Sequence, residues 1–267
     1  MKTLVGFAYI TLKENARRRS FYGVVVAYLV TLLFSRILME FSLQDPTKML
    51  VDFTFSFLSF LLTLSVLFIA TDVMAKDLEK KSVYILLAKG ISREGYVWGR
   101  AFGFLVFTFL LSFLLGAIFL LGSELLNFST PQTFRKEIDL FYGSVVVSVL
   151  WIKVFLLSTV VLFFSTFMTN FFLVFLVSVV VFIAGSSVEN LYYFVNVEKD
   201  RIAPLVRQAV TFLFYVLPSF SSPGPDVMLG TEKLQVRPLL LDLAKAVAYA
   251  LFLTASGSLL FRRRELM

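Results

Sequence analysis

The stretch LFYGSVVVSVLWIKVFLLSTVVLFFSTFMTNFFLVFLVSVVVFIAGSSV, residues 140–188, decides the fold class of this chain. It contains one charged residue, Lys153. A helix needs roughly 20 apolar residues to cross about 30 Å of hydrocarbon, so the stretch is long enough for two membrane-spanning helices. We place the break between them at 166–170, where small polar residues cluster and Asn170 can cap the second helix.

The composition of the whole chain agrees with a membrane protein. Of 267 residues, 58% are hydrophobic and 32 are Phe; the mean hydropathy is +0.86. Charged residues make up 16%, against about 25% in soluble proteins. A soluble domain of this size could not bury so much apolar surface. We therefore predict a single all-α transmembrane domain over 1–267, with six spans at about 21–40, 52–71, 96–122, 141–165, 170–188 and 239–261.

Two absences in the sequence exclude several kinds of chemistry. The chain has no Cys, which excludes disulfides, thiolate metal sites and cysteine catalysis. It has no His either, which excludes His-ligated metals and Ser-His-Asp catalysis. The spans carry no acid–base pair or nucleophile arrangement, so we expect no enzyme activity and no cofactor or metal held by this chain. We attribute the net charge of +7 to basic cytoplasmic loops rather than to nucleic-acid binding.

The distribution of Lys and Arg predicts the orientation. With six spans and both termini cytoplasmic, most basic residues of the short loops fall on the inner side of the cell (plasma or inner) membrane. Residues 1–19 then form a basic amphipathic pre-helix, and 72–95 form a cytoplasmic loop. Residues 189–238 form an extracytoplasmic loop. Within it, 204–218 is apolar but too short to span, which favours a re-entrant or interfacial segment that forms an outer gate.

The loop at 72–95 is the most informative segment. Residues 82–88 predict a short helix that is apolar through Val83, Ile85, Leu86 and Leu87. Gly90 can take the left-handed conformation that ends such a helix, and Ser92 can cap the start of the third span. An exposed apolar helix at this place either docks a partner or packs on its own spans or on lipid. The residues of this helix, taken alone, favour docking of a partner and packing on the chain's own spans or on lipid equally.

Three motifs carry a resemblance to a known family. Residues 79–93 read EKKSVYILLAKGISR and are followed by Trp98-Gly99-Arg100 at the opening of the third span. The outer loop contains LPSF at 217–220, and FRRREL at 261–266 follows the last predicted span. In this order and spacing, the chain resembles the ABC-2 type permease family over nearly its whole length. It departs from the family pattern at Lys89-Gly90, where many members have Pro, and at Ser219, where many have Asn.

The resemblance implies a division of labour between chains. ABC-2 type permeases are the membrane subunits of ATP-binding cassette exporters; two permease chains pair, here most simply as a homodimer, and each docks on a cytoplasmic ATPase subunit. Carried over by position, the coupling helix is 79–88. Its docking residues are Glu79, Ser82, Val83, Tyr84, Ile85, Leu86 and Leu87. No Gly of this chain is followed by Lys, so no P-loop is present, and ATP and Mg²⁺ belong to the partner ATPase.

Other residues of interest lie within the spans. Gly95, Gly99 and Gly103 recur every four residues, a spacing that favours close helix packing in lipid or a stiff pivot beside the coupling helix. Lys153 is a charge deep in the fourth span; it either faces a cavity, the dimer seam or a counter-ion, or has a structural role. We also predict helical ion pairs for two sequence neighbours, Arg36 with Glu40 and Asp242 with Lys245.

The main functional prediction is therefore an exporter permease for a lipid-like or amphipathic substrate, in contact with membrane lipids and driven by a separate ATPase. One alternative is an ATPase-independent secondary carrier that uses Lys153 as its coupling charge, although no half-to-half repeat is evident. The other alternative is a non-transporting membrane scaffold that grips a soluble partner with the same loop helix.

Overall fold

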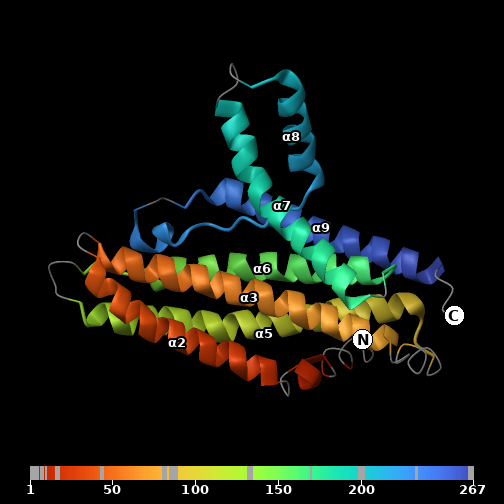
Figure 1. The fold of residues 1–267 in the computed structure, drawn as a ribbon, viewed down its shortest axis with the longest axis horizontal. Coiled ribbons are helices and arrows are strands. Elements are labelled where there is room, and N and C mark those ends of the chain that lie inside the picture. The colour runs from red at the N-terminus through yellow and green to blue at the C-terminus, as the bar shows by residue number, and fades with distance from the viewer. Residues whose placement is uncertain are drawn as a thin grey trace. The chain divides into compact units, whose positions relative to one another are not determined.

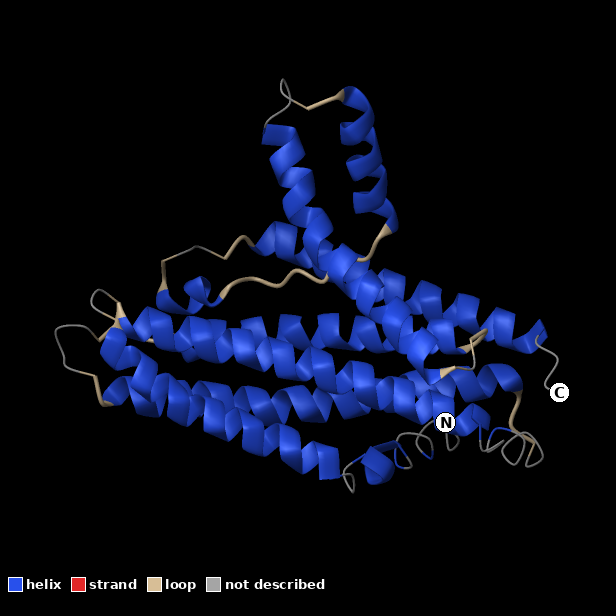
Figure 2. Cartoon of the chain, in the orientation of Figure 1, coloured by secondary structure: helices blue, strands red, loops and turns tan. Residues whose placement is uncertain are grey.

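The computed structural model describes residues 6, 9, 11–15, 19–42, 45–79, 83, 90–130, 135–168, 170–197, 202–231 and 234–263. Within these residues all regular structure is helical (Figures 1 and 2). The elements are α2 (Arg19–Phe41), α3 (Pro46–Glu79), α5 (Arg93–Phe128), α6 (Leu140–Ser165), α7 (Phe171–Val197), α8 (Pro204–Val216), the 3₁₀ helix η1 (Pro225–Leu229) and α9 (Val236–Arg263).

Six of these helices are long and apolar enough to cross a membrane: α2, α3, α5, α6, α7 and α9. The prediction of an all-α protein with six candidate spans is confirmed, and each predicted span lies largely within one of these helices. The segment predicted as a pre-helix is helical at residues 6, 9 and 11–15, and most of its remainder lies outside the described residues.

All six helices are longer than their predicted spans, and α3 and α5 are the longest of them. At about 1.5 Å per residue, α3 and α5 reach about 51 and 54 Å, well beyond the hydrocarbon thickness. The loop predicted at 72–95 is correspondingly too long, because α3 continues to Glu79 and α5 begins at Arg93. An ion pair between Lys76 and Asp72, one helical turn apart with nitrogen and oxygen 2.7 Å from each other, supports the extension of α3.

The break within 140–188 lies where the sequence predicts it. Helix α6 ends at Ser165 and α7 begins at Phe171. The Asn170 side-chain oxygen accepts a hydrogen bond of 2.8 Å from the backbone N–H of Phe172, which is the predicted cap.

The predicted outer loop, 189–238, contains much more helix than expected. Helix α7 continues to Val197, and α8 packs against it. Helix α8 lies beside the C-terminal part of α7 (Figure 1), and the rings of Tyr192 and Phe214 stack at 4.2 Å between centroids. With 13 residues, or about 20 Å, α8 is too short to span, as expected. Its placement in or on a membrane stays a prediction.

The chain divides into two compact units. The first comprises Met1–Val66, Phe102–Trp151 and Ser222–Val236. Inside it, the Phe55 and Phe119 rings pack at 5.8 Å, and the buried Tyr28 hydroxyl donates to the Thr54 carbonyl at 3.3 Å. The second comprises Leu67–Ala101, Ile152–Ser221 and Arg237–Met267. It holds all of α7 and α8 and almost all of α9.

Side-chain contacts join segments of the first unit that are far apart in the sequence. The buried Asn127 amide accepts from the Thr47 hydroxyl at 2.7 Å and donates to the Lys136 carbonyl at 2.8 Å. Lys48 forms an ion pair with Asp226 of η1, with 2.7 Å between nitrogen and oxygen. This hydrogen bond from Lys48 is the main reason that the pKa of the Asp226 carboxyl is lowered from 3.8, and the Thr231 hydroxyl adds to the effect.

The Asp226 contact makes a pH-dependent contribution to stability. Because the folded-state pKa is the lower one, the contribution is complete above pH 3.8 and is lost as the pH falls through the folded pKa. We expect Asp226→Asn to lower the melting temperature in detergent at pH 7, by a stability change of about 0.2–1 kcal/mol. The difference in melting temperature between Asp226→Asn and the wild-type chain should become smaller as the pH is lowered below 3.8. Lys48→Gln should also lower the melting temperature, and the double variant should melt no lower than the less stable single variant; additive losses would contradict the pairing.

Candidate functional site

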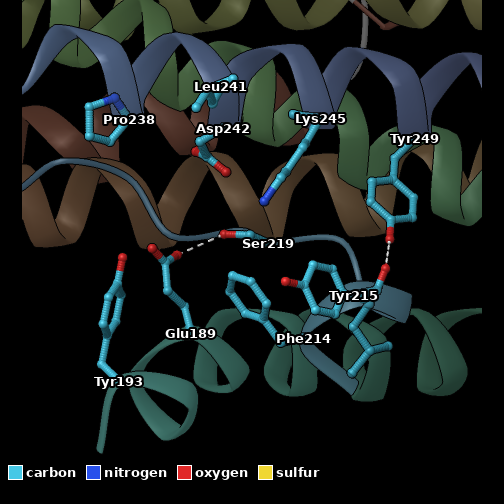
Figure 3. Close-up of a pocket in the computed structure, with 12 residues that line it drawn as sticks. Glu189, Tyr193, Phe214, Tyr215, Ser219, Pro238, Leu241, Asp242, Lys245 and Tyr249 are labelled. Atoms are coloured by element: carbon cyan, nitrogen blue, oxygen red, sulfur yellow. Dashed lines mark hydrogen bonds between the residues drawn. The ribbon is translucent and has the colours of Figure 1, made fainter. Parts of the chain in front are cut away.

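The second unit contains a cavity of about 310 Å³ lined by α7, α8, α9 and the segment that follows α8 (Figure 3). Helix α7 contributes Glu189 and Tyr193, and α9 contributes Asp242, Lys245 and Tyr249. The remaining wall comes from Phe214 and Tyr215 at the end of α8 and from Leu217 and Ser219 after it. The cavity therefore combines aromatic rings with ionisable side chains, the composition of a ligand site.

The ammonium group of Lys153 on α6 binds two oxygens beside this cavity. It is 2% exposed, and its ammonium group lies 2.5 Å from Asp242 Oδ2 and 3.0 Å from the backbone carbonyl oxygen of Ser219. A cation within an apolar helix is tolerated when it is paired and hydrogen-bonded. Of the partners predicted for Lys153, the structure thus supplies a counter-ion, Asp242.

Ser219 connects the buried pair to α7. Its hydroxyl donates to Glu189 Oε2 at 2.9 Å (Figure 3). Its carbonyl accepts a hydrogen bond from Lys153. The same residue belongs to the LPSF motif at 217–220, which has neither helical nor strand structure and passes α7 at Gly185. The motif fits there because α7 has Gly185 at the crossing: a Cβ at this position would overlap the Pro218 carbonyl oxygen and lie 2.7 Å from the Phe220 ring.

Aromatic side chains of α8 and α9 also line the cavity. The ammonium group of Lys245 lies 5.2 Å from the centre of the Phe214 ring, a cation–π distance. The far side of Phe214 is stacked on Tyr192, and the Tyr249 hydroxyl donates to the Tyr215 carbonyl. These contacts join α9 to the α7–α8 pair.

The predicted ion pair between Asp242 and Lys245 is wrong. Among the described residues, Asp242 pairs with Lys153, and Lys245 faces Phe214 instead. Spacing within one helix suggested the local pair, but a cation buried on a neighbouring helix has no water to compensate it and therefore takes the carboxylate. The other predicted pair, Arg36 with Glu40, is present at 3.8 Å.

A second cluster of charges lies in the same unit, where α3 ends and α5 begins. The buried guanidinium of Arg100 pairs with the Asp77 carboxylate, which also accepts a hydrogen bond of 2.6 Å from the fully buried Tyr96 hydroxyl. The Tyr96 ring stacks on Phe261 of α9 at 5.6 Å. This Asp77–Arg100–Tyr96 clamp therefore fixes the C-terminal end of α3 to the N-terminal end of α5.

The end of α9 is attached to the same place. The Arg93 side chain donates to the Arg262 carbonyl at 3.2 Å, and the Arg262 guanidinium pairs with Glu94 at 3.2 Å. Arg262 belongs to the FRRREL motif and Arg93 to the EKKSVYILLAKGISR motif, so the structure brings two of the three quoted motifs together.

The predicted loop helix can be compared with the structure only in part. Gly90 has the expected left-handed conformation, with φ of 83°, and the Ser92 hydroxyl accepts from the Gly95 N–H at 3.0 Å as a cap of α5. Val83 is helical and buried. Of the other predicted docking residues, Ser82, Tyr84, Ile85, Leu86 and Leu87 lie outside the described residues; Glu79 ends α3, and its side chain is also outside them.

The glycines that recur along α5 are half-buried or buried. Gly99 and Gly103 are buried, and Gly95 is half-buried with the Ser92 hydroxyl 2.9 Å from where its Cβ would be. This burial agrees with the helix-packing interpretation. A role as a pivot stays a prediction.

The sequence pointed to Lys153 and the LPSF motif, but not to the cavity beside them or to the other side chains that line it. Glu189 and Lys245 were missed as site residues because neither belongs to a recognisable motif, and only the approach of α7 and α9 shows that they line one cavity. The part of the chain that the structure describes contains no group of three or more carboxylates that could hold a metal ion. No family model and no curated protein matches the chain.

Removing Lys153 should destabilise the second unit through Asp242. In Lys153→Met the carboxylate loses its cation and the Ser219 carbonyl loses a donor; since Asp242 is 29% exposed, we expect a loss of about 1–3 kcal/mol, less than for a fully buried pair. Lys153→Met with Asp242→Leu should be more stable than Lys153→Met alone. Heat unfolding in detergent measures both. Arg36→Met, which removes an exposed cation, is the control; an equal effect there would contradict the assignment.

A methyl group at Gly185 should displace the LPSF segment. The Cβ would overlap backbone and an aromatic ring rather than a flexible side-chain end, so we expect Gly185→Ala to cost about 1–3 kcal/mol of unfolding free energy. Gly224→Ala is the matched control, because its Cβ would have no neighbour nearer than 3.9 Å and its φ of −68° suits alanine. Equal melting temperatures for the two variants would refute the close approach.

Proposed function

We propose that this chain is the permease subunit of an ABC-2 type exporter and works as a pair of permease chains with a separate ATPase. The observation that carries the proposal is the Asp77–Arg100–Tyr96 clamp at the two ends of the proposed coupling loop, 80–92. A loop that transmits force needs fixed ends, and buried charge-assisted hydrogen bonds hold both ends here.

The attachment of α9 adds support. Because Arg93 and Glu94 contact Arg262 and Tyr96 stacks on Phe261, movement of the loop would act on α3, α5 and α9 together. In the proposed topology this end of the helices is cytoplasmic, where the docked ATPase would bind the apolar face of 79–88. The cavity lined by α7, α8 and α9 supports an amphipathic substrate, since apolar, aromatic and charged groups share its wall.

The experiment is a gentle detergent purification of the tagged chain, expressed with its neighbouring genes. We expect a stoichiometric partner that has a P-loop and hydrolyses ATP. Replacing Leu86 and Leu87 by Asp should abolish copurification of this partner, because charges cannot enter an apolar groove without a large desolvation cost. Glu79→Gln should weaken it less.

Leu205→Asp on α8 is the matched control: Leu205 is 77% exposed on the hairpin, far along the chain from the loop, and the partner should remain bound. Purification of a stable homodimer without any ATPase would overturn the proposal. Loss of the partner in the control as well would overturn the assignment of the docking surface.

One observation favours a second candidate, a secondary carrier that needs no ATPase. The Lys153–Asp242 pair is an ion pair between two candidate membrane spans, an arrangement through which a coupling ion can act. The two candidates differ in their energy source: uptake or efflux in vesicles that stops with a proton or sodium ionophore, but not with ATP depletion, would favour the carrier.

A further inference from the structure

The cavity lined by α7, α8 and α9 presents two ionisable groups of opposite charge that the buried pair does not use. Glu189 accepts one hydrogen bond from Ser219, and among the described residues no cation forms an ion pair with it. Lys245 faces the Phe214 ring, and no carboxylate of the described segments lies within ion-pairing distance of its nitrogen. By contrast, the charges of Lys153 and Asp242 neutralise each other.

A ligand that complements this wall carries both a negative and a positive group. A phosphate suits Lys245, because an ammonium group binds phosphate as a compact point charge. A primary or quaternary ammonium suits Glu189 and the electron-rich faces of neighbouring rings such as Tyr193. At about 30 Å³ per water-sized group, the 310 Å³ cavity holds roughly ten such groups, which is enough for a phosphoethanolamine or phosphocholine moiety.

The surroundings of the cavity favour a lipid as the source of this moiety. Apolar side chains are exposed beside it on both flanking helices: Phe212 and Val216 on α8, at 66% and 50%, and Leu240 and Leu241 on α9, each at 59%. Leu241 also lines the cavity itself. Because α9 is long and apolar enough to cross a membrane, acyl chains attached to a bound headgroup can lie along these side chains.

We propose that this cavity binds the headgroup of a zwitterionic phospholipid, with the phosphate at Lys245 and the ammonium at Glu189. The proposal rests on the cavity and not on ATP-driven export, so it is tested on the purified chain without any ATPase. A failure here leaves the proposed transport function standing, and the absence of an ATPase partner leaves this site standing.

The test is lipid titration of the delipidated chain in detergent, with bound lipids counted by native mass spectrometry and unfolding followed by heating. We expect phosphatidylethanolamine to bind and to raise the melting temperature more than phosphatidylglycerol with the same acyl chains. Lys245→Gln should weaken both lipids by about tenfold, the scale of one lost charge-assisted contact, and Lys245→Arg should restore binding. Glu189→Gln still accepts from Ser219, so the fold is kept, but the preference for ethanolamine should vanish.

Arg207→Gln is the matched control, because Arg207 is an exposed cation on α8 that does not line the cavity. Equal affinity of the wild-type chain for the two lipids, or losses in Arg207→Gln as large as in Lys245→Gln, would overturn the proposal. Soluble O-phosphoethanolamine tests whether the ligand is a membrane lipid or a free compound with the same headgroup. It should stabilise the chain far less than the lipid at equal concentration, and equal stabilisation would overturn the assignment to a membrane lipid.

Should Lys245→Gln fail to fold, the comparison of the two lipids on the wild-type chain and on Glu189→Gln still decides the question. A preference for ethanolamine that Glu189→Gln abolishes supports the site, and a preference that survives this substitution overturns it.

Discussion

The cost of a charge inside an apolar helix is the constraint on which the second unit depends. Lys153 interrupts a run of residues that otherwise suits hydrocarbon, and its ammonium group must find oxygens within the protein. It finds them on two different segments, the Asp242 carboxylate of α9 and the Ser219 carbonyl after α8. Ser219 in turn reaches Glu189 of α7. One cation thereby determines that α6, α7, α9 and the LPSF segment lie together.

The cavity is a consequence of this arrangement. The LPSF segment can approach α7 closely because Gly185 has no side chain, and the hairpin of α7 and α8 is then joined to α9 by Tyr249 and by the contact of Lys245 with Phe214. The space that remains between these elements is bordered by Glu189 and Lys245, whose charges are not neutralised by the buried pair. A site for a zwitterionic headgroup therefore follows from the residues that anchor the fold, without a dedicated binding motif.

The Asp77–Arg100–Tyr96 clamp follows the same physical rule with a different result. Here, too, a buried charge is matched by an opposite charge and a further hydrogen bond, but the three residues are near one another in sequence and hold the ends of a short loop. Low local dielectric strengthens such contacts and makes partial loss expensive, so they hold the ends of α3 and α5 to each other and to the end of α9. If the proposed permease docks an ATPase at this loop, these contacts would carry its movement to three helices.

The sequence by itself determined the all-helical class, the six candidate spans, the break capped by Asn170, the left-handed Gly90 and the cap at Ser92. These features depend on apolar length and on local backbone chemistry, which are written in neighbouring residues. Only the tertiary structure decided that Lys153 pairs with Asp242, that Asp242 does not pair with Lys245, that α7 continues to Val197 against α8, and that Glu189 and Lys245 line one cavity. The physical reason is that the partner of a buried charge is chosen by desolvation among segments far apart in sequence, and helical spacing does not encode which helices meet.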